Sequence, residues 1–266
     1  NPRNGPEPSD PRRPAYDENV YRFQYGPVLC VAFNNNYWYA KDDYAAETGG
    51  SPEGCILDDQ LEWIEKTLAQ AEGNPTVRYV LLFAQEPVWP NGGHVHDAMW
   101  YHGNNNVSAY TRTENGMVRD PAGGIVEMRN RLWTAVAQST KVAAVLVGDE
   151  HCYHRTRIDS TTPVGIFPGD DPDADGVLDR YSPNPDFTHP TWQLCAGTAG
   201  APYYAEEKTP WQEAGAVACF SSQQGYLLLE ADAEKISAAF ITATGQRLDT
   251  VENLMRELQV FSFLRV

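Results

Sequence analysis

The stretch that decides the fold is Val142-Ala-Ala-Val-Leu-Val-Gly-Asp-Glu-His-Cys-Tyr-His-Arg155. Its first six residues form a short apolar run, rich in β-branched side chains and closed by a glycine. Such a run predicts a strand buried on both faces of a sheet that helices cover. Ligands of such sheets bind beyond the carboxyl ends of the strands. The next residues supply carboxylate and imidazole groups, which are metal ligands: Asp149, Glu150, His151 and His154.

The flanking sequence alternates between strand and helix patterns. Apolar residues at helical spacing predict helices over 57–71 and 125–139, and each feeds into an apolar run, 77–84 and 142–147. Upstream, 21–25 and 28–33 predict a hairpin or two successive strands around a Gly-Pro turn. This order predicts an α/β fold with a mixed sheet.

These segments resemble the calcineurin-like metallophosphoesterases, which include the purple acid phosphatases. The family's last signature reads Gly-His-x-His with an aromatic residue and often an arginine after it, and here Gly148-Asp-Glu-His151 precedes Tyr153 and Arg155. The Gln85-Glu-Pro87 strand end, the helix segment 59–66 and the glycine-rich segment 192–202 also match in order, so the resemblance covers roughly residues 15–250. It implies half of an αββα sandwich with a mixed sheet and a long irregular insertion.

The resemblance also implies metal positions, several of them altered. His151 keeps one histidine of the signature, whereas Asp149 stands where the family has the other. Gln85 replaces a ligand histidine, and an amide oxygen is a weaker ligand for a transition metal than imidazole. His94 or His96 could face the metals, or both could belong to a solvent-accessible loop. Tyr153, His154 and Arg155 complete the motif.

The family's first half carries the motifs Asp-x-His, Gly-Asp-x-x-Asp and Gly-Asn-His/Asp, and none of them stands ahead of the hairpin at residues 21–33. Two or three dispersed ligands do not make a two-metal phosphatase site. We therefore expect a degenerate domain that is non-catalytic as this chain alone and has a structural, assembly or binding role. The alternative is a metal-dependent phosphoester hydrolase completed by an upstream or separate segment.

A possible calcium loop lies in residues 159–219, which are rich in Pro, Gly, Asp and Thr. Oxygen ligands at loop positions 1, 3, 5, 7 and 9, with Gly176 at position 6, match a calcium-binding pattern: Asp171, Asp173, Asp175, Val177 and Asp179. Ser182 stands where an EF-hand has glutamate, and no flanking helix is predicted. The alternative to a calcium loop is an acidic solvated turn. If the loop binds calcium, a third interpretation of the chain's function is an extracellular calcium-binding module.

The remaining organisation follows from composition along the chain. Residues 1–19 predict an extended segment, 20–158 the α/β core, 159–219 the insertion, and 220–266 the closing strands. Residues 103–116 predict a long surface loop. The alternating residues Gln259–Val266 predict an exposed edge strand, which could pair with a protein partner or another copy.

The overall composition is that of a globular protein, with 266 residues, 42% hydrophobic and 21% charged. The net charge of −16 argues against nucleic acid, because phosphate contacts need clustered Lys and Arg. No window approaches the roughly 18 apolar residues of a membrane span. The first residue is Asn1, which fits a processed exported protein or a piece of a longer one, so we expect an extracellular or cell-envelope location.

The chain has five cysteines. Cys30 lies in an apolar run and is predicted to be a buried thiol. Cys55, Cys152, Cys195 and Cys219 could pair in disulfides or remain thiols, because spacing does not give connectivity.

Overall fold

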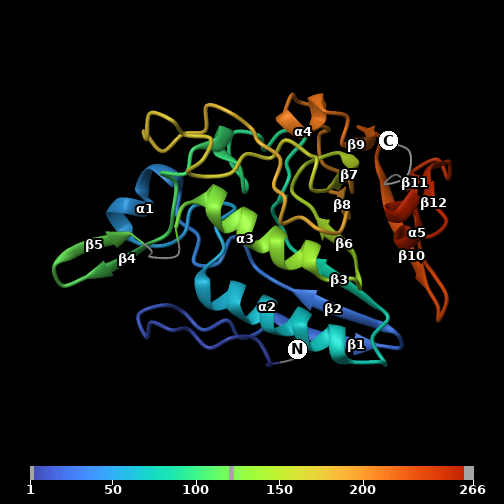
Figure 1. The fold of residues 1–266 in the computed structure, drawn as a ribbon, viewed down its shortest axis with the longest axis horizontal. Helices are drawn as coiled ribbons and strands as arrows, with labels where there is room; N and C mark the ends of the chain where they lie inside the picture. Colours follow the sequence, from blue (N-terminus) through green and yellow to red (C-terminus); the bar gives the residue numbers. More distant parts are fainter. Residues whose placement is uncertain (1–2, 120–122, 261–266) are drawn as a thin grey trace.

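The computed structural model describes residues 3–119 and 123–260. Its centre is a seven-stranded mixed sheet in the order β1-β2-β3-β6-β8-β7-β9 (Figure 1). β2, β3, β6 and β8 run parallel, and β1, β7 and β9 pair antiparallel to their neighbours. The strands are β1 (Tyr21–Tyr25), β2 (Val28–Ala32), β3 (Tyr79–Phe83), β6 (Val142–Val147), β7 (Tyr153–Ile158), β8 (Thr191–Ala196) and β9 (Val217–Ser221).

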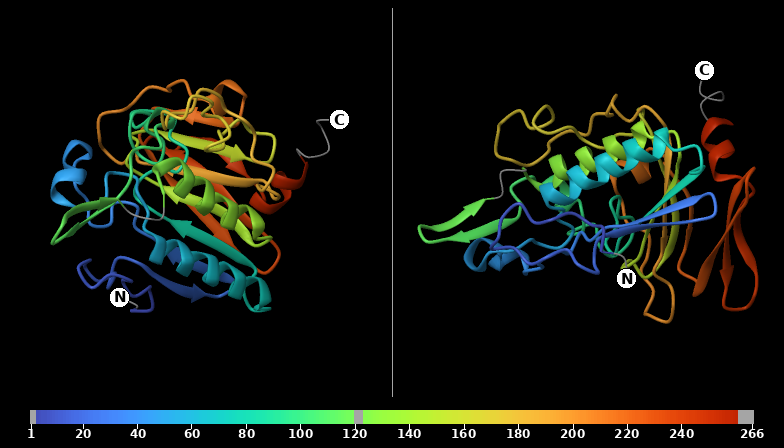
Figure 2. Two further views of the ribbon diagram at one scale, coloured as in Figure 1. Left: turned by 60° about the vertical axis from the view of Figure 1, so that its left-hand side comes forward. Right: turned by 90° about the horizontal axis from the view of Figure 1, so that it is seen from below.

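Two helices cover one face of this sheet, α2 (Asp58–Gly73) and α3 (Ile125–Gln138), which lie side by side (Figures 1 and 2). The predicted apolar stripe of α2 points inward, with Leu61 and Ile64 fully buried. These side chains join Val31, Val80 and others in the main hydrophobic core. The amphipathic pattern therefore fixes which face each helix buries.

A small antiparallel sheet covers part of the opposite face (Figure 2). It consists of β10 (Gly225–Ala231), β11 (Ile236–Thr242) and β12 (Arg247–Val251), followed by α5 (Leu254–Val260). Its apolar residues pack on Leu81, Ala144 and Trp192 of the large sheet in a second core. The fold is thus an α/β arrangement with a large mixed sheet and few helices, as predicted.

The hairpin and the helix–strand alternation of residues 21–147 are confirmed within two residues at each end. The loop prediction for 103–116 is wrong in its second half, because β4 (Tyr110–Thr113) and β5 (Gly116–Arg119) form a hairpin beside α1 (Asp42–Thr48). Alternation in a four-residue strand is too short to show in a polar sequence. The 3₁₀ turn η1 (Tyr101–Gly103) precedes this hairpin.

The predicted insertion, residues 159–219, contributes two strands of the large sheet, β8 and β9, and the short helix α4 (Pro210–Glu213). The first part of the glycine-rich segment 192–202, from Trp192 to Ala196, belongs to the buried strand β8. Only the glycines after Ala196 lie outside it. The run Thr191–Ala196 is short, and the glycines that follow dominate the local pattern.

The predicted C-terminal edge strand is wrong for Gln259 and Val260, which are the last residues of α5, and its remaining residues 261–266 lie outside the described part of the chain. Cys30 is only half-buried, contrary to prediction.

No helix in the described residues has the length and apolar character that crossing a membrane requires.

Candidate metal centre

The candidate site lies where the parallel strands β2, β3 and β6 end. The loops after these strands begin at Phe33, Ala84 and Gly148, and the backbone N–H of Gly148 donates to the carbonyl of Gln85 at 2.9 Å. Carboxyl ends of parallel strands meet at one edge of a sheet, so residues far apart in the sequence come together there.

Four side chains with metal-ligating atoms converge at this edge: Glu53, Glu86, His94 and Asp149. One ligand atom of each lies within 4.8 Å of the corresponding atom of every other. His94 Nε2 lies 3.5 Å from Asp149 Oδ2, and His94 Nδ1 lies 3.6 Å from Glu53 Oε1. Three carboxyl groups and one imidazole form a donor set that suits a divalent cation.

Glu86 occupies the deepest position and is fully buried. Its Oε1 accepts a hydrogen bond from Asn36 Nδ2 at 2.7 Å, whereas Oε2 has no hydrogen-bond donor among the described residues. Burial first, and then the nearby carboxylates of Asp149 and Glu53, raise the pKa of Glu86 to about 9. A cation between these groups would relieve both the desolvation and the like-charge repulsion.

A second carboxylate orients His94. Asp97 Oδ1 lies 3.0 Å from His94 Nδ1, which leaves Nε2 directed toward Asp149. The hydrogen bond to Asp97 raises the pKa of His94 to about 9, against the opposing effect of burial. An imidazole held by a carboxylate on one nitrogen and offered to a metal on the other is the usual arrangement of histidine ligands.

The loop that carries Glu53 is held against the loop after β3. Gly54 has φ +80°, and a Cβ there would lie 1.6 Å from the carbonyl oxygen of Ala98. The Tyr101 hydroxyl donates to the carbonyl of Glu53 at 3.0 Å, and the Gly54 N–H donates to Asn36 Oδ1 at 3.1 Å. Only glycine permits this approach, and the approach brings Glu53 to the site.

Asp149 adopts a left-handed backbone conformation, with φ +60°. A non-glycine residue there costs about 1 kcal/mol, and such residues cluster at functional sites. Its side chain is 27% exposed. The turn thus directs the Asp149 carboxylate to the open edge of the sheet, beside His94.

The next residue, Glu150, belongs to a different environment. Its side chain is fully buried, and Oε1 accepts hydrogen bonds from the backbone N–H groups of Asn91 at 2.7 Å and Gly92 at 2.6 Å. Its Oε2 lies 2.7 Å from His154 Nε2. Burial alone would lower the pKa of His154, but contacts with Cys195 and Glu150 raise it to about 10. Glu150 therefore fixes the loop that carries His94 to the loop that carries Asp149.

The structure places some of the metal ligands predicted from the sequence in the cluster and others outside it. Asp149 and His94 lie in the cluster. His96 does not, because its side chain is 67% exposed and pairs with Asp97. His151 stacks on the ring of Tyr204, with centroids 4.3 Å apart, and is not one of the four clustered residues. Gln85 has an exposed side chain.

The other motif residues hold the fold together. Tyr153 Oη donates to Asp249 Oδ2 at 2.7 Å, and Arg155 binds both oxygens of the same carboxylate at 2.8 and 3.1 Å. The Arg155 guanidinium also lies 4.6 Å from the centre of the Trp192 ring. These contacts attach β12 of the small sheet to β7 of the large one. His154 is buried with Glu150.

The predicted calcium loop is partly assembled. Carboxylate oxygens of Asp171, Asp173 and Asp179 lie within 4.8 Å of one another. Asp175 is outside this group, and its Oδ1 accepts from the backbone N–H of Val177 at 2.8 Å. Three of the five predicted positions therefore converge.

Sequence reasoning did not assign Glu53 or Glu86 to the site. Glu86 is the middle residue of the Gln85-Glu-Pro87 strand end. Its position next to Gln85, the predicted metal position, is the local signal that could have identified it as a ligand. Glu53 lies in a loop of glycines and has no local signal. Asn36 also belongs to the site, because its side-chain amide donates to Glu86 Oε1.

No family model matches the chain. No curated protein matches it. Among solved structures, it is similar to a purple acid phosphatase from yellow lupin (Lupinus luteus) seeds, at 17% identity and a TM-score of 0.45, over 87% of this chain and 32% of that one. It is also similar to PhoD, at 13% identity and a TM-score of 0.46, over 87% of this chain and 40% of that one. The chain spans less than half the length of either.

Proposed function

We propose that this chain is a metallophosphoesterase-like domain that binds one divalent cation through Glu53, Glu86, His94 and Asp149, and that it serves binding or assembly rather than catalysis. The observation that carries the proposal is the convergence of four ligand atoms within 4.8 Å around Glu86, a buried carboxyl group with one oxygen lacking a donor. The resemblance of the Gly148–Arg155 motif supports the family.

The residues fit a cation on charge as well as on position. Burying several carboxyl groups together is unfavourable unless a cation neutralises them. The set of carboxylate oxygens and one imidazole suits Mn²⁺, Zn²⁺ or Fe²⁺. Bound there, the cation would supply positive charge that attracts an anionic group, and the four side chains would hold it at the sheet edge.

The number of ligands favours a single cation. Phosphoester hydrolysis by two metals requires both to be held about 3.5–4 Å apart, each with its own ligands. Among the described residues, His151 stacks on Tyr204 and is not one of the four clustered residues, and only one imidazole lies in the cluster. A second metal would therefore depend on ligands from elsewhere.

The alternative is a metal-dependent phosphoester hydrolase that a longer form of the protein completes. The left-handed backbone at Asp149 and the Asp97–His94 pair favour it, because both features are typical of catalytic centres.

The test combines metal stoichiometry with activity. Chelator-treated protein is titrated with Mn²⁺ or Zn²⁺ in a calorimeter, and the bound metal is then counted by elemental analysis. We expect one metal ion per chain at this site in the wild type and none there in Glu86→Ala. The His96→Ala variant is the matched control and should bind normally. Hydrolysis of bis(p-nitrophenyl) phosphate by the chain above the free-metal background would overturn the non-catalytic role. Absence of binding would overturn the site.

A second ion site is supported by the aspartate loop. We propose that Asp171, Asp173 and Asp179 bind Ca²⁺ and order residues 171–179, which suits the extracellular or cell-envelope location proposed from the sequence. Added Ca²⁺ should raise the thermal midpoint of wild type but not of Asp173→Ala, whereas Asp186→Ala should behave as wild type. Equal shifts in wild type and Asp173→Ala would contradict the loop assignment.

A further inference from the structure

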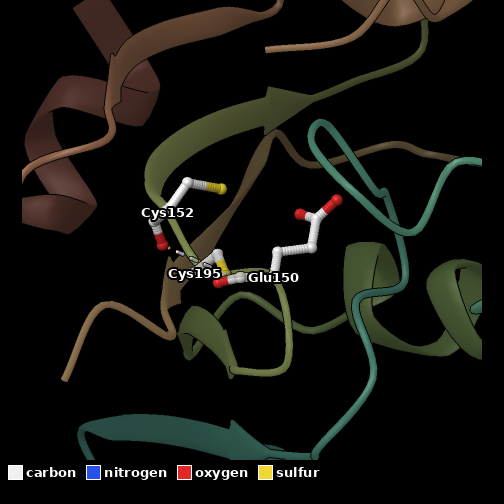
Figure 3. Close-up of side chains that lie close together, drawn as sticks. All are labelled: Glu150, Cys152 and Cys195. Atoms are coloured by element: carbon white, nitrogen blue, oxygen red, sulfur yellow. Dashed lines mark hydrogen bonds between the residues drawn. The ribbon is translucent and has the colours of Figure 1, made fainter. Parts of the chain in front are cut away.

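Two buried cysteines lie close to Glu150, the residue that follows Asp149 (Figure 3). Cys152 and Cys195 are both fully buried, and none of the chain's cysteines is in a disulfide in this structure. Their sulfur atoms lie within 4.8 Å of one another and of a carboxylate oxygen of Glu150. Figure 3 shows the three side chains converging from the turn before β7 and from β8.

Strand pairing produces this proximity. In the antiparallel pair of β7 and β8, Tyr153 lies opposite Ala196 and His154 lies opposite Cys195. Cys152 comes one residue before β7, so it lies at the same end of the pair. Side-chain alternation gives Cys152 and Cys195 the same face. Fixed backbone pairing therefore holds the two side chains next to each other.

The Cys195 sulfur interacts with the His154 imidazole and lies near three backbone carbonyl oxygens. Cys195 Sγ lies 3.6 Å from the carbonyl oxygens of Gly148 and Glu150 and 3.7 Å from that of Cys152. Thiols are weak hydrogen-bond donors. Oxidation of Cys195 would therefore remove only weak thiol hydrogen bonds, while His154 keeps its 2.7 Å contact with Glu150.

We propose that Cys152 and Cys195 form a disulfide, which ties the Asp149 turn to β8. The two thiols lose two protons and two electrons as the S–S bond forms. The oxidant is a small-molecule disulfide, whose own S–S bond breaks to release two thiols. This inference concerns residues outside the proposed metal centre and does not depend on metal binding there.

Charge favours a disulfide over a thiolate-bound metal at this position. The Glu150 carboxylate already accepts three hydrogen bonds, from Asn91, Gly92 and His154. A metal would require two more buried anions, the thiolates, in a space that excludes water. A disulfide is neutral and adds no charge to the buried network.

The burial also dictates when the bond forms. Burial raises the pKa of Cys195 well above its ordinary value, and contact with Cys152 contributes. Exchange requires a thiolate, so oxidation occurs while the chain folds and before the site closes. Once formed, the bond is shielded, and its reduction should require partial unfolding.

The experiment is a disulfide map of the full chain expressed in an oxidising compartment. Thiols are blocked with iodoacetamide in denaturant without reductant, and the protein is digested and analysed by mass spectrometry. The expected result is one cross-linked peptide pair joining Cys152 to Cys195, with Cys30, Cys55 and Cys219 alkylated. The intact mass before digestion should be lower than that of the reduced, identically blocked chain by two blocking groups.

Two results would overturn the proposal. One is full alkylation of all five cysteines even when the chain is refolded with oxidised glutathione. The other is a bound Zn²⁺ that disappears in Cys152→Ala but persists in Glu86→Ala, since that outcome would indicate a thiolate metal site. Failure of the proposed metal centre would instead appear as loss of binding with the cross-link intact.

Variants sharpen the assignment. Reductant plus mild denaturant should lower the thermal midpoint of wild type, and Cys152→Ala and Cys195→Ala should lose this sensitivity. Cys55→Ala, a buried cysteine on another loop, is the matched control and should keep it. Equal sensitivity in all three variants would contradict the pairing.

Discussion

Asp149 and Glu150 are neighbours in the sequence, yet their carboxylates meet opposite environments. The Asp149 side chain is 27% exposed and faces Glu86 and His94 in a group with an excess of acid. The Glu150 side chain is inaccessible and each of its oxygens is hydrogen-bonded. The Asp149 carboxylate shares one imidazole with two other acidic side chains, whereas the Glu150 carboxylate has a full set of hydrogen-bond partners.

This difference separates binding from stability. A buried charge with a full set of partners stabilises the fold and has no capacity left for a ligand. A carboxyl group held beside other carboxyl groups destabilises the metal-free site through like-charge repulsion, and a bound cation removes that repulsion. The same turn therefore serves the fold through Glu150 and the proposed metal centre through Asp149.

The largest expected effect comes from Glu150→Ala. It removes the acceptor for Asn91 and Gly92 and leaves the His154 imidazolium buried without its carboxylate, which should cost about 3–5 kcal/mol of unfolding free energy. Urea denaturation with a chelator present measures it. Glu150→Gln keeps an acceptor and should lose less. A loss within about 0.5 kcal/mol, as at ordinary surface sites, would contradict the structural role.

Histidine variants test the proposed metal centre around Asp149. His94→Ala should abolish tight cation binding, and Asp97→Asn should weaken it by about 10–100-fold, because the second carboxylate orients the imidazole. His96→Ala should leave affinity unchanged, since its ring is mainly in solvent. Calorimetric titration with Mn²⁺ distinguishes the three. Similar losses for His94 and His96 variants would mean that the loop positions are interchangeable.

The pH dependence of the metal-free protein should reflect Glu86 and His94. Both have folded-state pKa values raised to about 9. The stability that each contributes is complete below its unfolded pKa, about 4.3 for Glu and 6.5 for His, and is lost as pH rises through the folded value. We expect unfolding free energy to fall by about 1–3 kcal/mol from about pH 5 to 9.

Glu86→Gln is the matched test of that dependence. It should flatten the decline and stabilise the metal-free protein near pH 8, because folding no longer has to protonate a carboxylate that is ionised in the unfolded chain. Saturating Mn²⁺ should do the same for wild type. Denaturation curves at several pH values, with and without chelator, give the comparison. A wild-type stability that rises with pH would show that the carboxyl group is already neutralised.

The smallest expected effect is at the Asp149 backbone. Asp149→Gly relieves the left-handed conformation and should stabilise the metal-free chain by about 1 kcal/mol, while it removes one cation ligand. Asp149→Asn keeps the backbone preference and removes the charge, so it serves as the control. Thermal denaturation and Mn²⁺ titration of both variants separate strain from ligation. Destabilisation of the glycine variant would contradict the strain.

Several features of the fold followed from local sequence. The runs 77–84 and 142–147 became β3 and β6, and the stripe through Leu61 and Ile64 became the buried face of α2. Local periodicity suffices there because each element buries one continuous apolar surface. The polar hairpin β4–β5 and the strand β8 escaped prediction because their stability comes from neighbours rather than from pattern.

The site was determined only in part by sequence. The sequence by itself placed Asp149 after a buried strand, because a strand and the polar residues at its end are local features, and the family resemblance nominated His94 or His96. The sequence did not predict that Glu53 and Glu86 belong to the site. It also did not predict that Asp149 and Glu150 lie in different environments. Those outcomes depend on loop packing at Gly54 and on one left-handed backbone angle, which arise only when the whole sheet edge assembles. Proximity across about 100 residues is a property of tertiary structure, since local propensity carries no information about distant partners.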